Sequence, residues 1–389
     1  MVQEKRAYSK DKNLKVIFAL TLVAVMGVST ITPVLPDIRA DLHLSNQQVG
    51  LLVVFFSLPG IIMTPLLGIL ADRFGRKTVL VPSLVMFALA GFTCFFLRDF
   101  HWILFFRVLQ GAGAASLGSL NSTLIGDIYS KKERPAVMGL VASVLSIGTA
   151  AYPAIGGALA IFGWHYPFLM PLLALPVAWA VLFKLENPEP KGEGKFMAYI
   201  KEAAKQMKSF TVVFMFLANF VVFVTLFGAF LTYLPLFMND NFNSSSLEIG
   251  MTLTGMSLVT AVTSAMLGKI SKHFSERQLI IAGFMAYVIA FSIVPFLTTP
   301  LMLAIPITIF GIGHGINFPS IQVYLVKVAS LKYRGMFMSF NGMVLRLGQT
   351  AGPLIIGGFY LIGGHLAAFS GAALLSLLVV IFLSFFLKM

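Results

Sequence analysis

Three basic side chains, Arg107, His314 and Arg346, lie inside long apolar stretches of the sequence. A charged residue at the centre of a membrane helix costs about 2.5–3.5 kcal/mol even on lenient scales, so such residues are functional candidates by default. Histidine titrates in the physiological pH range, which makes His314 a candidate proton site. The alternatives are a neutral, hydrogen-bonded His314 packed by glycines, and an Arg107 that snorkels to the membrane surface.

The acidic side chains are placed differently. Every Asp and Glu lies in a loop or near the end of an apolar stretch, and the nearest to an apolar interior are Asp37, Asp72, Asp127 and Glu248. Exporters of lipophilic cations are expected to use buried carboxylates, which this chain lacks at depth. We therefore expect the buried basic groups to complement an anionic, zwitterionic or neutral amphiphile.

The elements that must position these groups are membrane helices. The chain of 389 residues is 58% hydrophobic and only 11% charged, against roughly 25% charged for a soluble domain. A span needs about 20 apolar residues, and twelve apolar stretches are present. They are residues 14–36, 46–71, 78–97, 102–125, 136–162, 166–183, 211–237, 248–268, 279–297, 301–325, 336–362 and 366–387.

This organisation predicts an all-α membrane protein with twelve transmembrane helices. Little chain remains for a catalytic domain, and the sequence shows no clustered metal ligands, nucleophile triad or phosphate loop, so we expect neither an enzyme nor a metal site. No cofactor is expected. The single cysteine, Cys94, excludes an internal disulfide.

The net charge of +13 reflects the orientation of the chain in the membrane. With a cytoplasmic N-terminus, 24 of the 28 Lys and Arg residues fall in inner segments. This is the positive-inside pattern, so we expect a multi-pass protein of the cell membrane with both termini cytoplasmic. The same placement argues against a nucleic-acid partner, and we expect a monomer in contact with membrane lipids.

The sequence also repeats itself at an offset of 200 residues. Seven glycines of the first half recur in the second, namely Gly50, Gly68, Gly111, Gly113, Gly148, Gly157 and Gly163. The repeat predicts two pseudo-symmetric six-helix halves, residues 1–183 and 211–389, joined by a cytoplasmic linker at 184–210. Two such halves around a central site are typical of alternating-access transporters.

The loop after the second stretch reads Gly68-Ile-Leu-Ala-Asp72-Arg73-Phe-Gly75-Arg76-Lys77. It resembles the signature loop G-x-x-x-D-R-x-G-R-[RK] of the major facilitator superfamily at every defining position. Its glycines permit close helix approach and a tight turn, and its charges can pair with neighbouring helix ends. The second copy, from Gly268, has lost the acidic residue and the second glycine.

Two further elements carry the same resemblance. The fourth stretch, Phe106-Arg107-Val-Leu-Gln110-Gly111-Ala-Gly113, is similar to the family's R-x-x-Q-G-x-G element. The fifth holds Gly148 and Pro153 in a pattern similar to that of drug:proton antiporters, with Tyr152 in place of a glycine. The eleventh repeats its core as Gly348-Gln-Thr-Ala-Gly352-Pro353. Generic close packing of spans is the alternative explanation.

The resemblance implies a fold, an activity and site residues. It implies the major facilitator fold and proton-driven export of a small molecule, with the proton gradient as the only coupling agent. Proton coupling is expected at Asp127, Arg107, His314 and Asp37. Gating is expected at Gly68, Asp72, Arg73, Gly75, Arg76, Arg134, Gly148, Pro153, Gly352 and Pro353. The family also suggests that Asp127 meets Arg73.

The family's cavity is lined mainly by spans 1, 4, 7 and 10. In span 7, Phe216, Phe220, Phe223, Phe227 and Phe230 recur at steps of four and three beside Asn219, which predicts an aromatic stripe. The candidate substrate-binding residues are Arg107, Asn219, Phe220, Phe223, Phe227, His314, Asn317 and Arg346. Helix or lipid packing would explain the stripe equally well.

Two other functions stay open. An importer or uniporter of a polar or anionic metabolite would fit if Tyr152 marks loss of the antiporter pattern. A lipid flippase or a membrane receptor would fit if the basic groups meet a lipid headgroup.

Overall fold

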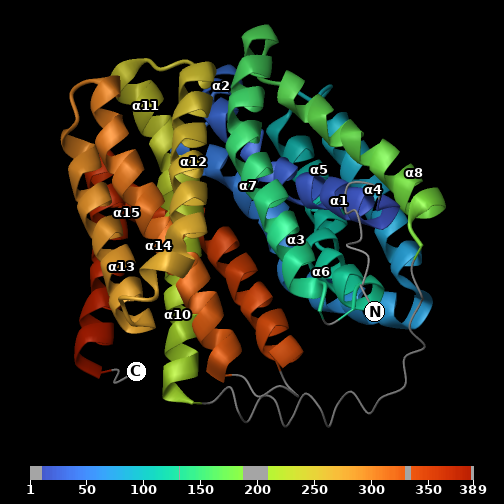
Figure 1. Ribbon diagram of the computed structural model, residues 1–389. Helices are drawn as coiled ribbons and strands as arrows, with labels where there is room; N and C mark the ends of the chain where they lie inside the picture. Colours follow the sequence, from blue (N-terminus) through green and yellow to red (C-terminus); the bar gives the residue numbers. More distant parts are fainter. Residues whose placement is uncertain (1–10, 131, 187–208, 329–333, 387–389) are drawn as a thin grey trace.

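The computed structural model of the chain describes residues 11–130, 132–186, 209–328 and 334–386, and all of its regular structure there is helical (Figure 1). Most of the linker predicted at 184–210 lies outside these described residues. We call residues 11–186 the N-terminal part and residues 209–386 the C-terminal part. Figure 1 shows each part as a bundle of long helices, with the two bundles side by side.

The N-terminal part is built from long helices and short one-turn segments. They are α1 (Lys12–Ser29), η2 (Thr32–Val34), α2 (Leu35–Asp41), α3 (Asn46–Phe74), α4 (Arg76–Thr93), α5 (Phe100–Ala114), α6 (Leu117–Ile128), α7 (Arg134–Leu159), η3 (Ala160–Phe162), η4 (Tyr166–Leu173) and α8 (Ala174–Lys184). Ser45 begins α3 with a capping box, its side chain accepting from the backbone N–H of Gln48 while the Gln48 side chain accepts from that of Ser45.

The C-terminal part follows a similar plan. It contains α10 (Phe210–Val224), η5 (Thr225–Tyr233), α11 (Leu234–Phe242), α12 (Ser246–Ile270), α13 (Glu276–Ile293), η6 (Val294–Phe296), η7 (Pro300–Leu303), α14 (Ala304–Val328) and α15 (Arg334–Phe386). Ser245 begins α12 with the same type of capping box as Ser45, 200 residues earlier. The segment η5 is a π-helix, a form frequent at functional sites.

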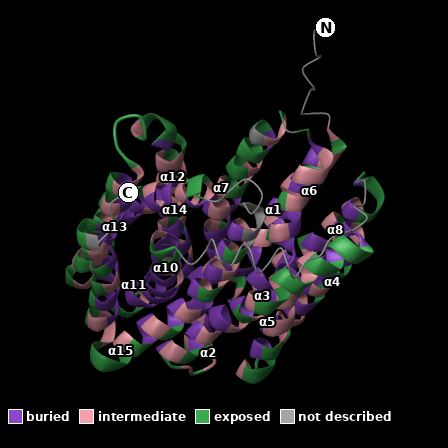
Figure 2. Ribbon diagram, turned by 90° about the horizontal axis from the view of Figure 1, so that it is seen from below, coloured by how far each residue is buried: buried purple, intermediate pink, exposed green. Residues whose placement is uncertain are grey.

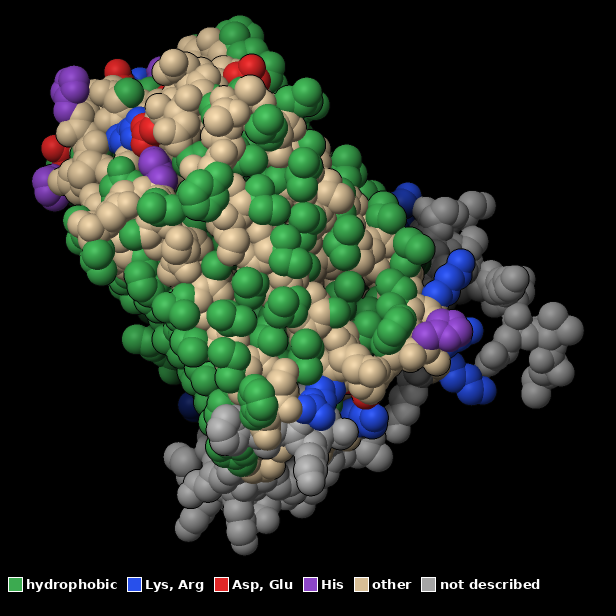
Figure 3. All heavy atoms as spheres, turned by 90° about the vertical axis from the view of Figure 1, so that its left-hand side faces the viewer, with side chains coloured by type: hydrophobic (Ala, Val, Ile, Leu, Met, Phe, Trp, Pro, Cys, Tyr) green, Lys and Arg blue, Asp and Glu red, His purple; other side chains and the backbone are tan. Residues whose placement is uncertain are grey.

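Eleven described segments are long and apolar enough to cross a membrane. The last, Phe340–Phe385, spans 46 residues of α15, whose backbone leaves helical geometry at Gly363 and Gly364. Gly364 has φ of 62°, a conformation that glycine adopts without strain. Hydrophobic side chains cover the middle of the face in Figure 3, and the charged side chains gather at its ends. The chain is therefore a multi-pass membrane protein.

The bundle has two distinct ends. We call the end with the start of α10 and the end of α15 the terminal end, and the opposite end, with α2 and α11, the distal end (Figure 1). The buried residues lie mainly where helices of the same part face one another and where the two parts meet (Figure 2).

The two parts meet at the crossing of α7 with α12. A methyl group placed on Gly157 would overlap the backbone of Ser246, and one on Gly250 would overlap the carbonyl oxygen of Pro153. The hydroxyl of Thr254 donates to the backbone oxygen of Ala150 at 2.6 Å. Glycine is needed here because only a residue without a side chain lets two backbones approach so closely.

A second crossing, of α3 with α15, is its counterpart at the offset of 200. A methyl group on Gly50 would lie 3.6 Å from Cβ of Pro353, and one on Gly357 would lie 3.9 Å from Cγ of Gln47. The pair Gly50 and Pro353 thus mirrors the pair Gly250 and Pro153. The repeat seen in the sequence reappears as two contacts at equivalent positions, of which the contact between Gly50 and Pro353 is the looser.

The same four helices separate toward the terminal end. Methyl groups placed on Gly68 of α3, Gly139 of α7, Gly255 and Gly268 of α12 and Gly342 of α15 would meet nothing within 4 Å. Every hydrogen bond and ion pair that joins the two parts, among the described residues, involves a residue of the distal half of the bundle. The structure is therefore closed at the distal end and parted at the terminal end.

This arrangement predicts opposite outcomes for two glycines of α12. Gly250→Val should be destabilised by about 1–3 kcal/mol, because the added side chain is forced into the Pro153 carbonyl. Gly255→Val, with open space around it, is the matched control and should unfold at the temperature of the unmodified protein. Thermal unfolding of the purified protein in detergent measures both. Equal unfolding temperatures for the two variants would contradict the close approach.

Candidate functional site

Arg107 is wholly buried within the N-terminal part, on α5. Its Nη1 donates to the backbone oxygen of Gly27 and to Oε1 of Gln110, both at 2.8 Å, and its Nε donates to the backbone oxygen of Leu52 at 3.1 Å. The guanidinium lies 4.4 Å from the centre of the Phe56 ring, a cation–π contact. It joins α1, α3 and α5, and an exposed, snorkelling position is excluded.

Arg346 lies at the meeting of the two parts. It is half-buried on α15, and Nη1 donates to Oε1 of Gln349 at 3.1 Å. Its side-chain stem packs on Gly60 of α3, where an added methyl would lie 3.1 Å from Cδ of Arg346. Within the described residues, neither Arg107 nor Arg346 forms an ion pair. Both guanidinium charges lack an acidic partner in this arrangement.

His314 lies within the C-terminal part, on α14. Its Nδ1 is 2.7 Å from the hydroxyl of Tyr287, and its ring is parallel to those of Phe310 and Phe318. Asn317, one turn further along, is fully buried, and neither polar atom of its side chain has a hydrogen-bond partner among the described residues. Arg107, His314 and Arg346 share no hydrogen-bond or ring partner there, so the structure does not join them into one cluster.

Asn219 belongs to a chain of amides at the centre of the C-terminal part. Its amide donates to Oδ1 of Asn341 at 2.6 Å, and the Asn341 amide donates to Oε1 of Gln322 at 2.9 Å. Three helices, α10, α15 and α14, are thereby joined. The carbonyl oxygen of Asn219 is buried and has no partner among the described residues.

The predicted aromatic stripe divides into two groups. Phe216, Phe223 and Phe230 are buried, whereas Phe220 and Phe227 are half-buried. Phe230 stacks on Phe310 with ring centres 4.6 Å apart. The uniform helical spacing assumed for the stripe is wrong beyond Val224, because the π-helix η5 changes the register there. Part of the stripe serves packing within the C-terminal part.

The signature loop turns at Gly75, whose φ of 99° ends α3 and begins α4. Arg76 is buried and bonds two carboxylates: its Nη1 pairs with Asp72, and its Nε pairs with Asp127 at 3.1 Å. Arg73, the partner that the resemblance suggested for Asp127, instead lies over the ring of Phe74. Because Arg73 lies in the last turn of α3 while Arg76 begins α4, the Gly75 turn directs Arg76 toward α6, which carries Asp127.

The other expected gating residues lie at helix crossings. Arg134 donates to the backbone oxygens of Tyr129 and Gly126 at the terminal end. Gly148 packs on Leu22 and Val25 of α1, and Gly352 packs on the backbone of α10 and η5. These last two contacts stay within one part. Pro153 and Pro353 lie at the crossings between parts, and Gly68 lies in the separated region.

Asp37, expected in proton coupling, lies at the distal junction of the two parts. The hydroxyl of Ser246 lies 2.5 Å from Oδ2 of Asp37 and 2.9 Å from the backbone oxygen of Pro33. The carboxylate therefore helps to hold α12 against α2 and η2.

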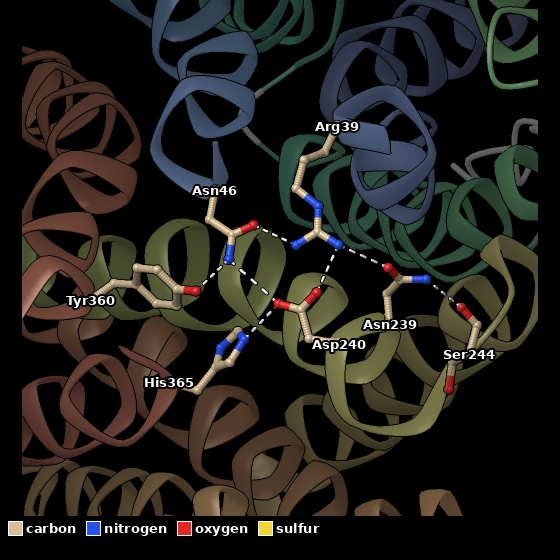
Figure 4. A network of polar contacts seen from close by, with 7 residues as sticks. All are labelled: Arg39, Asn46, Asn239, Asp240, Ser244, Tyr360 and His365. Atoms are coloured by element: carbon tan, nitrogen blue, oxygen red, sulfur yellow. Dashed lines mark hydrogen bonds and ion pairs between the residues drawn. The ribbon is translucent and has the colours of Figure 1, made fainter. Parts of the chain in front are cut away.

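The sequence reasoning missed a polar network at the distal end (Figure 4). Its centre is an ion pair between Nη2 of Arg39 and Oδ1 of Asp240, 2.7 Å apart and joining the two parts. Nε2 of His365 is 2.8 Å from Oδ2 of Asp240. Asn46 donates to the Tyr360 hydroxyl at 2.7 Å and accepts from Arg39 at 2.6 Å.

One signal of this network was present in the sequence. Arg39 also donates to Oδ1 of Asn239 at 3.0 Å, and these two residues are 200 positions apart, which is the offset of the repeat. Residues related by such a repeat lie near the pseudo-symmetry axis when they touch. A search for polar pairs at that offset would have found Arg39 and Asn239.

No metal chemistry is indicated at the sites described so far. Among the residues that the structure describes, no group of three or more His, Cys, Asp or Glu side chains is placed to hold a metal ion.

Comparison with known proteins places this geometry in a family. The family model described as Major Facilitator Superfamily matches residues 17–245 and 215–389. The chain is 29% identical over 358 residues to "Multidrug resistance protein 1" of Bacillus subtilis (strain 168), covering 90% of each chain. It is 28% identical over 359 residues to "Tetracycline resistance protein, class D" of Salmonella ordonez, covering 89% of each.

A solved structure shares the arrangement over nearly the whole chain. A bacterial homolog of the human lysosomal transporter Spinster, in an inward-facing and unoccupied conformation, superposes with a TM-score of 0.75 at 22% identity. The match covers 96% of this chain and 95% of the other. At this identity the likeness concerns the fold.

The signature loop yields a prediction that separates its two arginines. Arg76→Gln should lower the free energy of unfolding by about 2 kcal/mol, because it leaves the partly buried Asp127 without its charged donor. Arg73→Gln is the matched control, since Arg73 bonds no carboxylate, and it should change stability by less than about 0.5 kcal/mol. Chemical unfolding in detergent compares them. A larger loss for Arg73→Gln would contradict the pairing.

Proposed function

The chain belongs to the major facilitator superfamily, and we propose that it exports a small amphiphilic compound in exchange for protons by alternating access. It is a transporter and not an enzyme, with relatives whose names describe drug resistance. The observation that carries the proposal is the closure of the distal end by two equivalent crossings, α7 with α12 and α3 with α15, while the same helices part toward the terminal end.

The two crossings support a rocking motion of two halves. The contacts of Gly250 with Pro153 and of Gly50 with Pro353 are related by the repeat of 200 residues. We propose that the N-terminal and C-terminal parts are six-helix halves, with α15 forming two spans on either side of Gly363 and Gly364. If both crossings separated together, the distal side would open. In other transporters, rocking of one repeat against the other opens the two sides in turn.

The termini are proposed to lie in the cytoplasm, because the basic residues gather with them. The terminal end is then the cytoplasmic side, and the parted arrangement faces the cytoplasm. Substrate would enter from that side and leave through the distal end. We propose a monomer in the cell membrane, with protons as the coupling ion and no cofactor.

The substrate class follows from the unpaired cations. Arg346 is half-buried where the two parts meet and has no acidic partner among the described residues, beside Gly60 of the opposite part. A buried guanidinium favours a carboxylate, phosphate or other acceptor on the ligand. We therefore propose an anionic, zwitterionic or neutral amphiphile, with Arg346 as the principal binding cation and His314, Asn219 and Asn317 as further candidates.

Proton coupling is tested with the purified protein in liposomes. An inward proton gradient should drive export of a candidate amphiphile, and adding substrate should move protons at zero membrane potential. Substrate flux that does not respond to the gradient would instead indicate a uniporter. Movement of a labelled lipid between leaflets in the same vesicles would indicate a flippase.

The role of Arg346 is tested by its removal. Arg346→Ala should weaken binding of anionic amphiphiles about tenfold or more, because a charged hydrogen bond is worth roughly 1.5–3 kcal/mol. Arg98→Ala is the matched control, since Arg98 is bonded to backbone oxygens of its own loop at the distal end. If Arg346→Ala binds every anionic compound normally while cation efflux persists, the proposed substrate class is wrong.

A further inference from the structure

The network at the distal end contains a histidine whose position links proton binding to opening. Asp240 is contacted from both parts of the molecule, and one of these contacts is a weak one from the Asn46 amide of α3, 3.4 Å from Oδ2 (Figure 4). Arg39, on α2, belongs to the N-terminal part and pairs with Oδ1 at 2.7 Å. His365, on α15, belongs to the same part as Asp240 and pairs with Oδ2 at 2.8 Å. Separation of the two parts would remove Arg39 and Asn46 and leave His365 in place.

The closed arrangement fits a neutral histidine. Nε2 of His365 faces the Asp240 carboxylate and therefore donates its N–H there. Nδ1 is buried and has no hydrogen-bond partner among the described residues. A proton added at Nδ1 would create a buried N–H without an acceptor, and it would place a second cation beside a carboxylate that already holds Arg39.

The other groups around His365 bring no further charge to it. The Tyr360 ring lies 5.0 Å from the His365 ring, and Tyr233 lies 5.3 Å from Tyr360. Phe237 of α11 and Phe369 of α15 cover the other sides of the ring. Phenols stay neutral between pH 5 and 8. Arg39 and Asp240 are thus the charged groups that face His365 within the described residues.

We propose that His365 is a proton-binding site whose occupancy opens the distal end. Once Arg39 has left, a protonated His365 is the sole counter-ion of Asp240, and its Nδ1 gains contact with water. The open arrangement therefore binds the proton more tightly than the closed one. By linkage, protons on the distal side shift the equilibrium toward the open arrangement.

The inference rests on the proposed alternating-access cycle, in which the distal end faces the outside. In that cycle, an acidic exterior would favour the arrangement that releases substrate and takes up protons. The proton would be held by an imidazole at the closing network, in addition to any proton site deeper in the bundle.

The test measures opening directly, without substrate or gradient. Spin labels on Ala40→Cys of α2 and Asn241→Cys of α11, in a Cys94→Ala background, report the separation of the two parts at the distal end. The ratio of open to closed arrangement should rise about tenfold between pH 7.5 and pH 5.5, since one unit of difference in proton affinity is a factor of ten.

Three variants sharpen the test. His365→Gln keeps a donor for Asp240 but cannot be charged, and it should lose the response to pH. Arg39→Gln should favour the open arrangement already at pH 7.5 and also lose the response. His101→Gln is the matched control, because His101 lies beside Asp99 within the N-terminal part, 3.8 Å away, and joins no second part; its response should stay intact.

Two results would overturn the proposal. One is a His365→Gln variant, folded by size-exclusion chromatography, that keeps the full response with an unchanged midpoint. The other is an unmodified protein that closes as the pH falls. Because label distances need no transport, loss of proton-driven export in liposomes would reject the proposed function and leave this result standing.

Discussion

The arrangement of the whole molecule depends on the contacts at two helix crossings, one of which is a close approach of backbones. At the crossing of α7 with α12, and at that of α3 with α15, glycine faces the backbone or proline of the opposite part. Between apolar helices in lipid there is no hydrophobic driving force, so packing and interhelical hydrogen bonds must hold the parts together. Thr254, Ser246 and Arg39 supply such bonds at the distal side.

The repeat preserves geometry more faithfully than chemistry. Thr64 donates to the backbone oxygen of Ala115, and Ser264 donates to that of Gly315, which are the same bond at the offset of 200. The pair Arg76 with Asp127 recurs as Glu276 with Lys327, with the charges exchanged. The second half therefore keeps an ion pair at this position, between α13 and α14, with the opposite polarity.

Much of this architecture was accessible from the sequence. Hydrophobic stretches, glycine spacing and the signature loop predict the membrane helices and the family, because lipid forces every span to satisfy its own backbone. The membrane helices and the family are confirmed. Residue pairing was less accessible: Asp127 meets Arg76 and not Arg73, and Arg107 bonds carbonyl oxygens of α1 and α3. Such pairings depend on helix rotation, which a periodic pattern leaves undetermined. The prediction of the aromatic stripe assumed a regular α-helix, and the π-helix η5 changes the rotation of the side chains beyond Val224.

The break at Gly363 and Gly364 has a consequence for the residue that follows it. His365 comes directly after the positive φ of Gly364, with no connecting loop between the two arms of α15. A loop there would let the imidazole sample many positions. Each contact with Asp240 would then cost the conformational entropy of ordering that loop. The glycine corner removes that freedom in advance. The backbone of His365 is therefore fixed at the joint between the two arms of α15. A change in the charge of its imidazole acts directly at that joint.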